Sequence, residues 1–163
     1  MTTHANRIEE TANREIAVTR VFDASPELVW KAWTHPEHVV KWWGPRGFTT
    51  TIQEMDVRPG GVWRLVMHGP DGTDYPNRTV FTEVVPPRRL SYTNAGGRKG
   101  GPAAQFQMAA TFDPEGARTR VTMRMIFPSA AEREKVVQEY GALEGARDTM
   151  DRLGEHLAKM ANA

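Results

Sequence analysis

Residues 105–127 read QFQMAATFDPEGARTRVTMRMIF, and this stretch decides the fold class. Apolar residues occupy every second position on both sides of the turn segment at residues 113–116. Such alternation is typical of β-strands with one buried face, and the short Pro- and Gly-containing segment predicts an antiparallel hairpin. The buried face of this hairpin would carry aromatic, aliphatic and Met side chains: Phe106, Met108, Ala110, Phe112, Val121, Met123, Met125 and Phe127.

A long amphipathic helix is expected directly after the hairpin. Ser129 and Glu132 have the spacing of a capping box. Apolar residues then recur every three or four positions: Val136, Tyr140, Leu143, Ala146, Met150, Leu153, Leu157 and Met160. Gly141 and Gly145 interrupt this stripe, which indicates a bend or a place where another element packs closely. The helix must bury its stripe, and the concave face of a curved sheet is large enough to receive it.

The residues before the hairpin predict a strand, two short helices and more strands. Ser25 and Pro26 have the residue types of a helix start, and Thr34 and Glu37 are spaced like the capping box of a second helix. Strands are expected at residues 15–22, 49–57, 62–68, 79–85 and 90–93. The expected fold is α+β, a curved antiparallel sheet of about six or seven strands wrapped around a long C-terminal helix.

Length and composition restrict the class of protein. The 163 residues suit one domain, which we place at residues 14–161 after a flexible arm at residues 1–13. The net charge of +1 argues against a polyanion-binding protein, so no nucleic-acid partner is expected. Cysteine is absent, which excludes disulfides and thiolate metal sites. No apolar run is long enough for a membrane span, and the polar N-terminus lacks a signal-peptide core. We therefore expect a cytoplasmic protein with no membrane partner.

Several segments follow one another in the order of a known family. They are SPELVWKAWT (25–34), WWGP (42–45), EMDVRPGG (54–61), GPDG (69–72), YPNR (75–78), EVVPPRRL (83–90) and FPS (127–129). In this ordered set the chain resembles homologues of the C-terminal domain of the activator of heat shock protein 90 ATPase. That family lies within the START-like, polyketide-cyclase-related (SRPBCC) superfamily. The resemblance covers about residues 14–158 and implies the helix-grip fold, in which superfamily members bind hydrophobic ligands in a cavity.

The predicted binding site is formed by inward-facing residues of the strands and the helix. It comprises Trp43, Trp63, Leu65, Met67, Tyr92, Phe106, Met108, Met123, Met125, Phe127 and Tyr140. Met side chains adapt to varied apolar shapes, and the Tyr92 and Trp63 polar atoms could orient a ligand. Plain core packing explains any single one of these residues as well. The leading hypothesis is binding of a small hydrophobic or aromatic ligand between the sheet and the C-terminal helix.

Two other functions remain open. A cyclase- or hydrolase-type enzyme could use the same cavity, with Tyr75, Tyr92, Arg64 or His68 as candidate polar groups, but the sequence identifies no catalytic residue. A chaperone-ATPase-activating module would follow from the resemblance alone. A homodimer through exposed strand edges is a further expectation.

Other motifs carry weaker signals. His35 and His38 lie three residues apart, but no third ligand is nearby and no metal or cofactor is expected. Glu54, Asp56, Arg58 and Arg64 favour cross-strand ion pairs on the solvated face. The Gly-rich segment at residues 94–102 lacks the ending of a phosphate-binding loop and is expected to be a flexible loop, with a lid over the cavity as the functional alternative.

Overall fold

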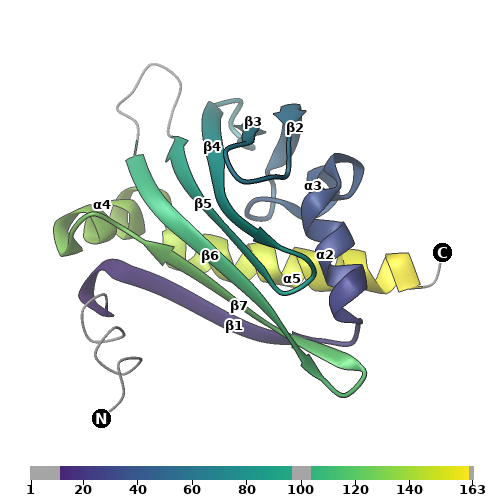
Figure 1. The fold of residues 1–163 in the computed structure, drawn as a ribbon. Helices are drawn as coiled ribbons and strands as arrows, with labels where there is room; N and C mark the ends of the chain where they lie inside the picture. The colour runs from purple at the N-terminus through teal and green to yellow at the C-terminus, as the bar shows by residue number, and fades with distance from the viewer. Residues whose placement is uncertain (1–11, 97–103, 162–163) are drawn as a thin grey trace, which may run out of the picture.

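One antiparallel sheet of seven strands curves around the longest helix, α5 (Figure 1). This computed structural model describes residues 12–96 and 104–161. The strands lie in the order β1-β7-β6-β5-β4-β3-β2. Their bounds are β1 (Glu15–Phe22), β2 (Thr49–Met55), β3 (Val62–His68), β4 (Asp74–Val85), β5 (Arg89–Gly96), β6 (Ala104–Glu115) and β7 (Arg118–Ile126). The predicted α+β helix-grip architecture is confirmed.

The helices cover the concave side and one end of the sheet. Two short helices follow β1, α2 (Pro26–Thr34) and α3 (Pro36–Trp42). Two more follow β7, α4 (Ala130–Tyr140) and α5 (Ala142–Ala161). A short 3-10 helix, η1 (Ala12–Arg14), precedes β1, and the rest of the expected arm lies outside the described residues. None of the described helices combines the length and apolar composition that crossing a bilayer requires.

The predicted long C-terminal helix is confirmed as α5, and the part of the stripe before Gly141 forms a separate helix, α4. Gly141 ends α4 in the left-handed conformation with φ of +60°, where its amide donates to the Val137 carbonyl. Gly145 does not break α5; a Cβ there would lie 3.2 Å from Pro45 Cγ. The two glycines therefore serve the two purposes that the sequence left open, a bend at the first and a close approach at the second.

The helix starts agree with the sequence at two of three positions. Ser25 accepts a hydrogen bond from the Leu28 amide, and Ser129 accepts one from the Glu132 amide. The predicted Thr34 cap is wrong, because the Thr34 hydroxyl donates to the Trp30 carbonyl and the N-cap of α3 is His35. Pro36 at the first position of α3 has no amide to satisfy, which explains why a side-chain cap is dispensable.

Strands β4 and β5 are longer than their sequence patterns indicated. β4 begins at Asp74 rather than residue 79, and β5 extends to Gly96. Register shifts interrupt the β2–β3 pairing between Ile52 and Glu54 and the β4–β5 pairing between Phe81 and Glu83. Bulges of this kind bend strands, and here they accompany the curvature that wraps the sheet around α5.

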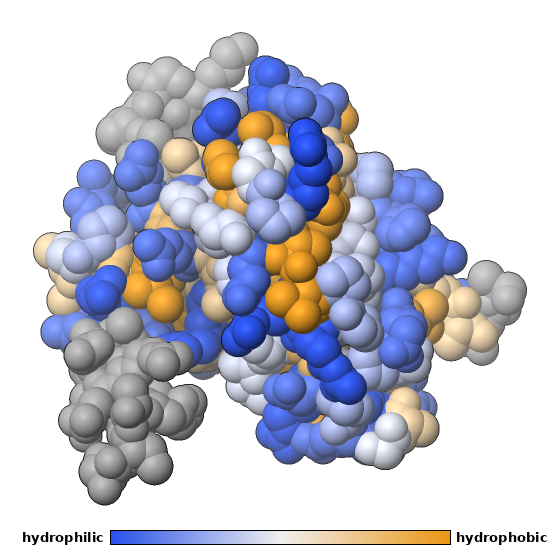
Figure 2. All heavy atoms as spheres, in the orientation of Figure 1, coloured by the Kyte–Doolittle hydropathy of each residue, from blue (hydrophilic) through white to orange (hydrophobic). Residues whose placement is uncertain are grey.

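The core lies between the sheet and the helices and is rich in aromatic rings. Trp33, Trp42 and Trp63 are at most 1% exposed, and α5 adds the buried Met150 and Leu153. The outer face of the sheet carries both apolar and hydrophilic residues. Figure 2 shows an apolar strip near the middle of the view, flanked by hydrophilic residues.

Candidate functional site

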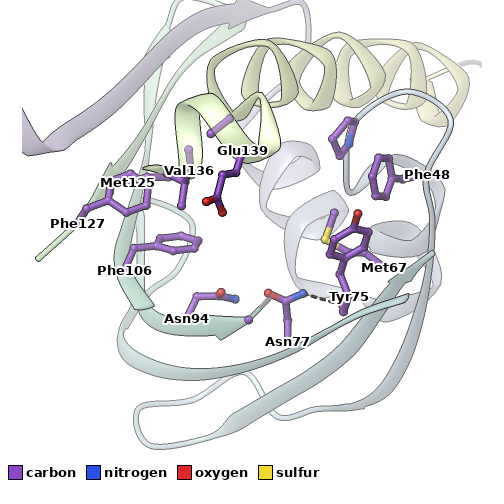
Figure 3. Close-up of a pocket in the computed structure, with 13 residues that line it drawn as sticks. Phe48, Met67, Tyr75, Asn77, Asn94, Phe106, Met125, Phe127, Val136 and Glu139 are labelled. Carbon is purple, nitrogen blue, oxygen red and sulfur yellow. Dashed lines mark hydrogen bonds between the residues drawn. The ribbon is translucent and has the colours of Figure 1, made fainter. Parts of the chain in front are cut away.

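A cavity of about 310 Å³ opens between one end of the sheet and the junction of α4 and α5. Most of its lining is apolar, and Figure 3 shows the side chains arranged around an empty centre. The sheet contributes Met67, Tyr75, Asn77, Asn94, Gly96, Phe106 and Met125, and Phe127 lines the cavity from the position directly after β7. The connection between α3 and β2 contributes Pro45 and Phe48. The helices contribute Val136, Glu139 and Ala142.

A second space of about 210 Å³ adjoins the first and reaches deeper under α5. The two spaces share Met67, Asn94, Phe106 and Met125 among their lining residues. The deeper space adds Trp43, Gly44, Met108, Met123, Gly145, Ala146 and Thr149. Gly145 lacks a side chain where α5 passes Pro45, so the helix backbone itself forms part of the wall.

The few polar groups of the cavity come from three elements. Asn77 on β4 donates from Nδ2 to the Tyr75 carbonyl over 2.9 Å. Asn94 on β5 is 7% exposed and donates from Nδ2 to Thr79 Oγ1 over 2.9 Å. Asn94 Oδ1 is buried and has no hydrogen-bond partner among the described residues. Figure 3 shows both amides on the sheet side, with the Glu139 carboxylate pointing toward them from α4.

Gly96 makes room for the Asn77 amide. These two residues are paired across β4 and β5, and a Cβ at Gly96 would lie 1.9 Å from Asn77 Oδ1. No side chain larger than hydrogen fits there unless Asn77 moves. The glycine at this position therefore keeps an amide at the cavity.

The α3–β2 connection is held against α5 by charged side chains. Arg152 Nη1 lies 3.3, 2.9 and 3.1 Å from the carbonyl oxygens of Trp43, Gly44 and Pro45. Burial lowers the pKa of Arg152, and the neighbouring Arg46 adds to this effect. Arg46 in turn forms a salt bridge with Glu155. Because Trp43 lines the deeper space and Pro45 lines both spaces, these contacts fix one wall of the site.

A pair of imidazoles joins α3 to α5 beside this connection. His38 Nδ1 and His156 Nε2 lie 3.0 Å apart and share a hydrogen bond. Burial lowers the pKa of each, and the charges of Lys31 at His38 and of Lys159 at His156 act in the same direction. Because one of the two nitrogens must accept, the shared hydrogen bond requires at least one of the two imidazoles to be neutral. Within residues 12–96 and 104–161, no group of three His, Asp or Glu side chains could hold a metal ion.

The family described as Activator of Hsp90 ATPase homolog 1-like protein matches residues 23–158. The chain belongs to this family. No curated protein matches the chain. Among solved structures, a protein from Arthrobacter aurescens is similar with a TM-score of 0.84 and 25% identity, over 91% of this chain and 88% of its own. A protein from Nitrosomonas europaea has a TM-score of 0.76 and 28% identity, over 91% and 97%.

A third similar structure, from Mycobacterium smegmatis, has a TM-score of 0.79 and 26% identity, over 89% of this chain and 91% of its own. These similarities span the sheet and the helices together, so this member of the family has the START-like helix-grip fold over most of its length.

Seven of the eleven residues predicted for the site line one or both spaces in this family member: Trp43, Met67, Phe106, Met108, Met123, Met125 and Phe127. Trp63, Leu65 and Tyr92 lie in the packed core and line neither space. Tyr140 ends α4, and its side chain lies outside the described part of the chain. The first part of the Gly-rich segment, residues 94–96, belongs to β5, and residues 97–103 lie outside the described ranges.

Of the polar residues considered for catalysis, Tyr75 alone lines the cavity. Arg64 and His68 alternate with the inward-facing Leu65 and Met67 on β3, so they lie on the outer face. There His68 contacts Thr51 Oγ1 and Asp74 Oδ1, each over 2.8 Å, and Arg64 pairs with Glu54. The expected solvated ion pairs are therefore present, and Asp56 pairs with Arg58.

Sequence reasoning missed Asn77 and Asn94. Both continue a period-two pattern, since Asn94 follows Leu90 and Tyr92 on β5, and Asn77 precedes Thr79 and Phe81 on β4. The alternation would have placed both Asn residues on the inward face if the predicted strands had been continued through polar residues. Val136 and Glu139 carry the helical spacing of one face, but which face of α4 meets the cavity depends on the bend at Gly141.

Proposed function

We propose that this protein binds a small, largely apolar ligand in the cavity between the open end of the sheet and the α4–α5 junction. The observation that carries the proposal is an apolar space of about 310 Å³ bordered by a buried amide without a full set of partners. A buried polar atom without a partner costs free energy, and a ligand that supplies the missing hydrogen bond removes that cost.

The walls suit a ligand whose body is flat or aromatic. Phe48 and Tyr75 contact each other at a centroid distance of 5.8 Å, and Phe106 and Phe127 do so at 5.4 Å. Met67 and Met125 complete the walls with flexible thioether side chains that adapt to different shapes. Burial of apolar ligand surface at ~25 cal/mol per Å² would drive binding. The volume is at the small end of ligand pockets, which span about 300–1,000 Å³.

Titration with N-phenyl-1-naphthylamine, a neutral aromatic dye that fluoresces in apolar surroundings, tests this proposal. We expect saturable binding with one dye per chain. Native mass spectrometry of protein purified from its source would in addition detect a ligand that is retained. Dye binding that fails to saturate, or that needs more than one dye per chain, contradicts a single cavity site.

A matched pair of variants locates the bound dye. Ala142 lines both spaces, so Ala142→Phe places a ring in the cavity and is expected to weaken dye binding at least about tenfold. Ala158 is exposed on the same helix, and Ala158→Phe is expected to leave the affinity unchanged. Full affinity in the Ala142 variant would overturn this location for the site.

A further inference from the structure

The Glu139 carboxylate and the amide oxygens at the cavity accept hydrogen bonds, and the Tyr75 hydroxyl can both donate and accept. The Asn77 nitrogen donates to a backbone carbonyl, which can only accept, so the orientation of this amide is fixed with its oxygen directed elsewhere. The Asn94 nitrogen is likewise engaged, and its buried oxygen has no partner among the described residues. Glu139 adds a carboxylate.

No positively charged side chain among the described lining residues balances the negative charge at the cavity. The lining residues include the Glu139 carboxylate and no Lys, Arg or His side chain. The helix geometry acts in the same direction. Glu139 lies in the last turn of α4, and the carbonyl groups at a helix C-terminus carry partial negative charge that favours cations.

Aromatic rings surround the same space. Figure 3 shows Phe106 on one side of the centre and Tyr75 and Phe48 on the other, with Glu139 between them at the α4 side. The face of an aromatic ring attracts a cation that has lost part of its water. The rings, the carboxylate and the amide oxygens therefore all favour the same kind of ligand group.

We propose that the cavity selects ligands in which a compact aromatic body carries a protonated primary amine. The ammonium group lies between Glu139 and the Asn94 amide, and the aromatic body fills the space between Phe106 and Met67. This inference rests on the proposed ligand-binding function and adds the charge and chemistry of the ligand. A carboxylic acid of the same size is disfavoured, because its carboxylate would approach the like-charged Glu139 carboxylate and the unpartnered Asn94 oxygen.

Three probes with one shared body test the inference: 1-naphthylmethylamine, 1-naphthalenemethanol and 1-naphthoic acid. Their affinities are measured by isothermal titration calorimetry at pH 7 and low salt. We expect the amine to bind about tenfold more tightly than the alcohol, the size of effect typical of a hydrogen bond to a charged group, and the acid to bind most weakly. Added salt should reduce the amine preference, since Glu139 is exposed.

The possible results separate this inference from the function on which it rests. Equal affinity for the amine and the alcohol, or tighter binding of the acid, overturns the inference and leaves the binding function supported. Failure of all three probes, together with failure of N-phenyl-1-naphthylamine, overturns both.

Glu139→Gln removes the charge and keeps the shape of the side chain. We expect the amine and the alcohol to bind this variant with affinities within about twofold of each other, while the affinity for the alcohol stays at the wild-type value. Glu144→Gln is the matched control, because Glu144 is exposed in the first turn of α5 and does not line the cavity. An amine preference that persists in Glu139→Gln contradicts the assignment.

Discussion

Tyr92 buries a hydroxyl that has no hydrogen-bond partner among the described residues. The residue is 2% exposed, and its ring meets those of Trp63 and Phe81 edge to face at 5.8 and 5.7 Å. Burial raises the pKa of this hydroxyl, and the nearby Trp33 indole opposes the shift only in part. Tyr92 therefore stabilises the protein through its ring, and its hydroxyl contributes little.

Replacing Tyr92 by Phe separates these two contributions. We expect Tyr92→Phe to change the free energy of unfolding by less than about 1 kcal/mol, because an unpaired buried group is removed. Tyr92→Ala should cost about 3–5 kcal/mol through the cavity it leaves. Urea denaturation measures both values. A loss of several kcal/mol in the Phe variant would indicate that the hydroxyl has a partner in solution.

The bend between α4 and α5 is the feature of the helices on which the cavity most depends. Val136 and Glu139 lie before the bend and Ala142 after it, and all three line the cavity. A straight helix would direct these side chains differently. Gly141 permits the bend through its φ of +60°, and open space surrounds the position where a Cβ would be. A substitution there is opposed by backbone strain alone.

Gly141→Ala is expected to lower the free energy of unfolding by about 1–2 kcal/mol, the cost of the left-handed conformation for a residue with a Cβ. Gly141→Asn should cost less, since Asn adopts this conformation more readily. Thermal or urea denaturation compares the two variants. Equal stability of the Ala variant and the wild type would show that the break between the helices is absent in solution.

The contact between α3 and α5 makes stability depend on pH through His38 and His156. Both have a lowered pKa in the folded protein, so the unfolded chain binds protons at these sites more tightly. Their stabilisation is complete above the unfolded pKa of about 6.5 and is lost as the pH falls below it. The charges of Lys31 and His35 lower the pKa of His38, and the charge of Glu37 raises it. The charges of Lys41 and Lys159 lower the pKa of His156.

We therefore expect the melting temperature to fall between pH 8 and pH 5, and to fall less in His156→Gln than in the wild type. The matched control is His35→Gln, because His35 lies outside the shared hydrogen bond and its charge is the smallest of the causes that shift the pKa of His38; its pH dependence should stay close to that of the wild type. Differential scanning fluorimetry at several pH values gives the comparison. The same pH dependence in all three proteins would exclude the buried pair as its source.

At the scale of the whole molecule, a ligand in the cavity would connect the sheet, the α3–β2 connection and both C-terminal helices. It would thus stabilise the folded state as a unit. At a dye concentration of 100 times its dissociation constant the gain is about 2.7 kcal/mol, which corresponds to a rise in melting temperature of about 5–10 °C. Ala142→Phe should show a much smaller rise. A dye that saturates in the fluorescence titration without raising the melting temperature contradicts binding to the folded cavity.

The fold was predictable because local patterns repeat across it. Alternation in β3, β6 and β7 identified inward-facing residues, and the stripe after Ser129 identified the helices that cover them. The cavity was less predictable, because alternation tells which face a residue occupies and not what covers it. Trp63 is covered by the ring of Trp43 at a centroid distance of 5.0 Å, whereas Met67, on the same face of the same strand, borders the open space.

The bend at Gly141 shows a second limit on prediction from sequence. Gly141 and Gly145 are the same residue type four positions apart, yet only the first adopts a positive φ. The second stays within α5, and its missing side chain permits the close approach of Pro45, a residue about a hundred positions earlier in the chain. Contacts of this range are absent from any local pattern.

The pairing of β1 with β7 has a consequence for how the chain folds. Arg124 and Glu15 on these strands form an ion pair across 109 positions of sequence. Pairings this distant give a high contact order, which slows folding toward the millisecond-to-second range of β-rich domains. α5 follows all seven strands, so the part of the concave face that α5 covers stays exposed until this helix docks. A partly folded sheet with exposed Phe and Met side chains is prone to aggregation, and docking of α5 removes this exposure.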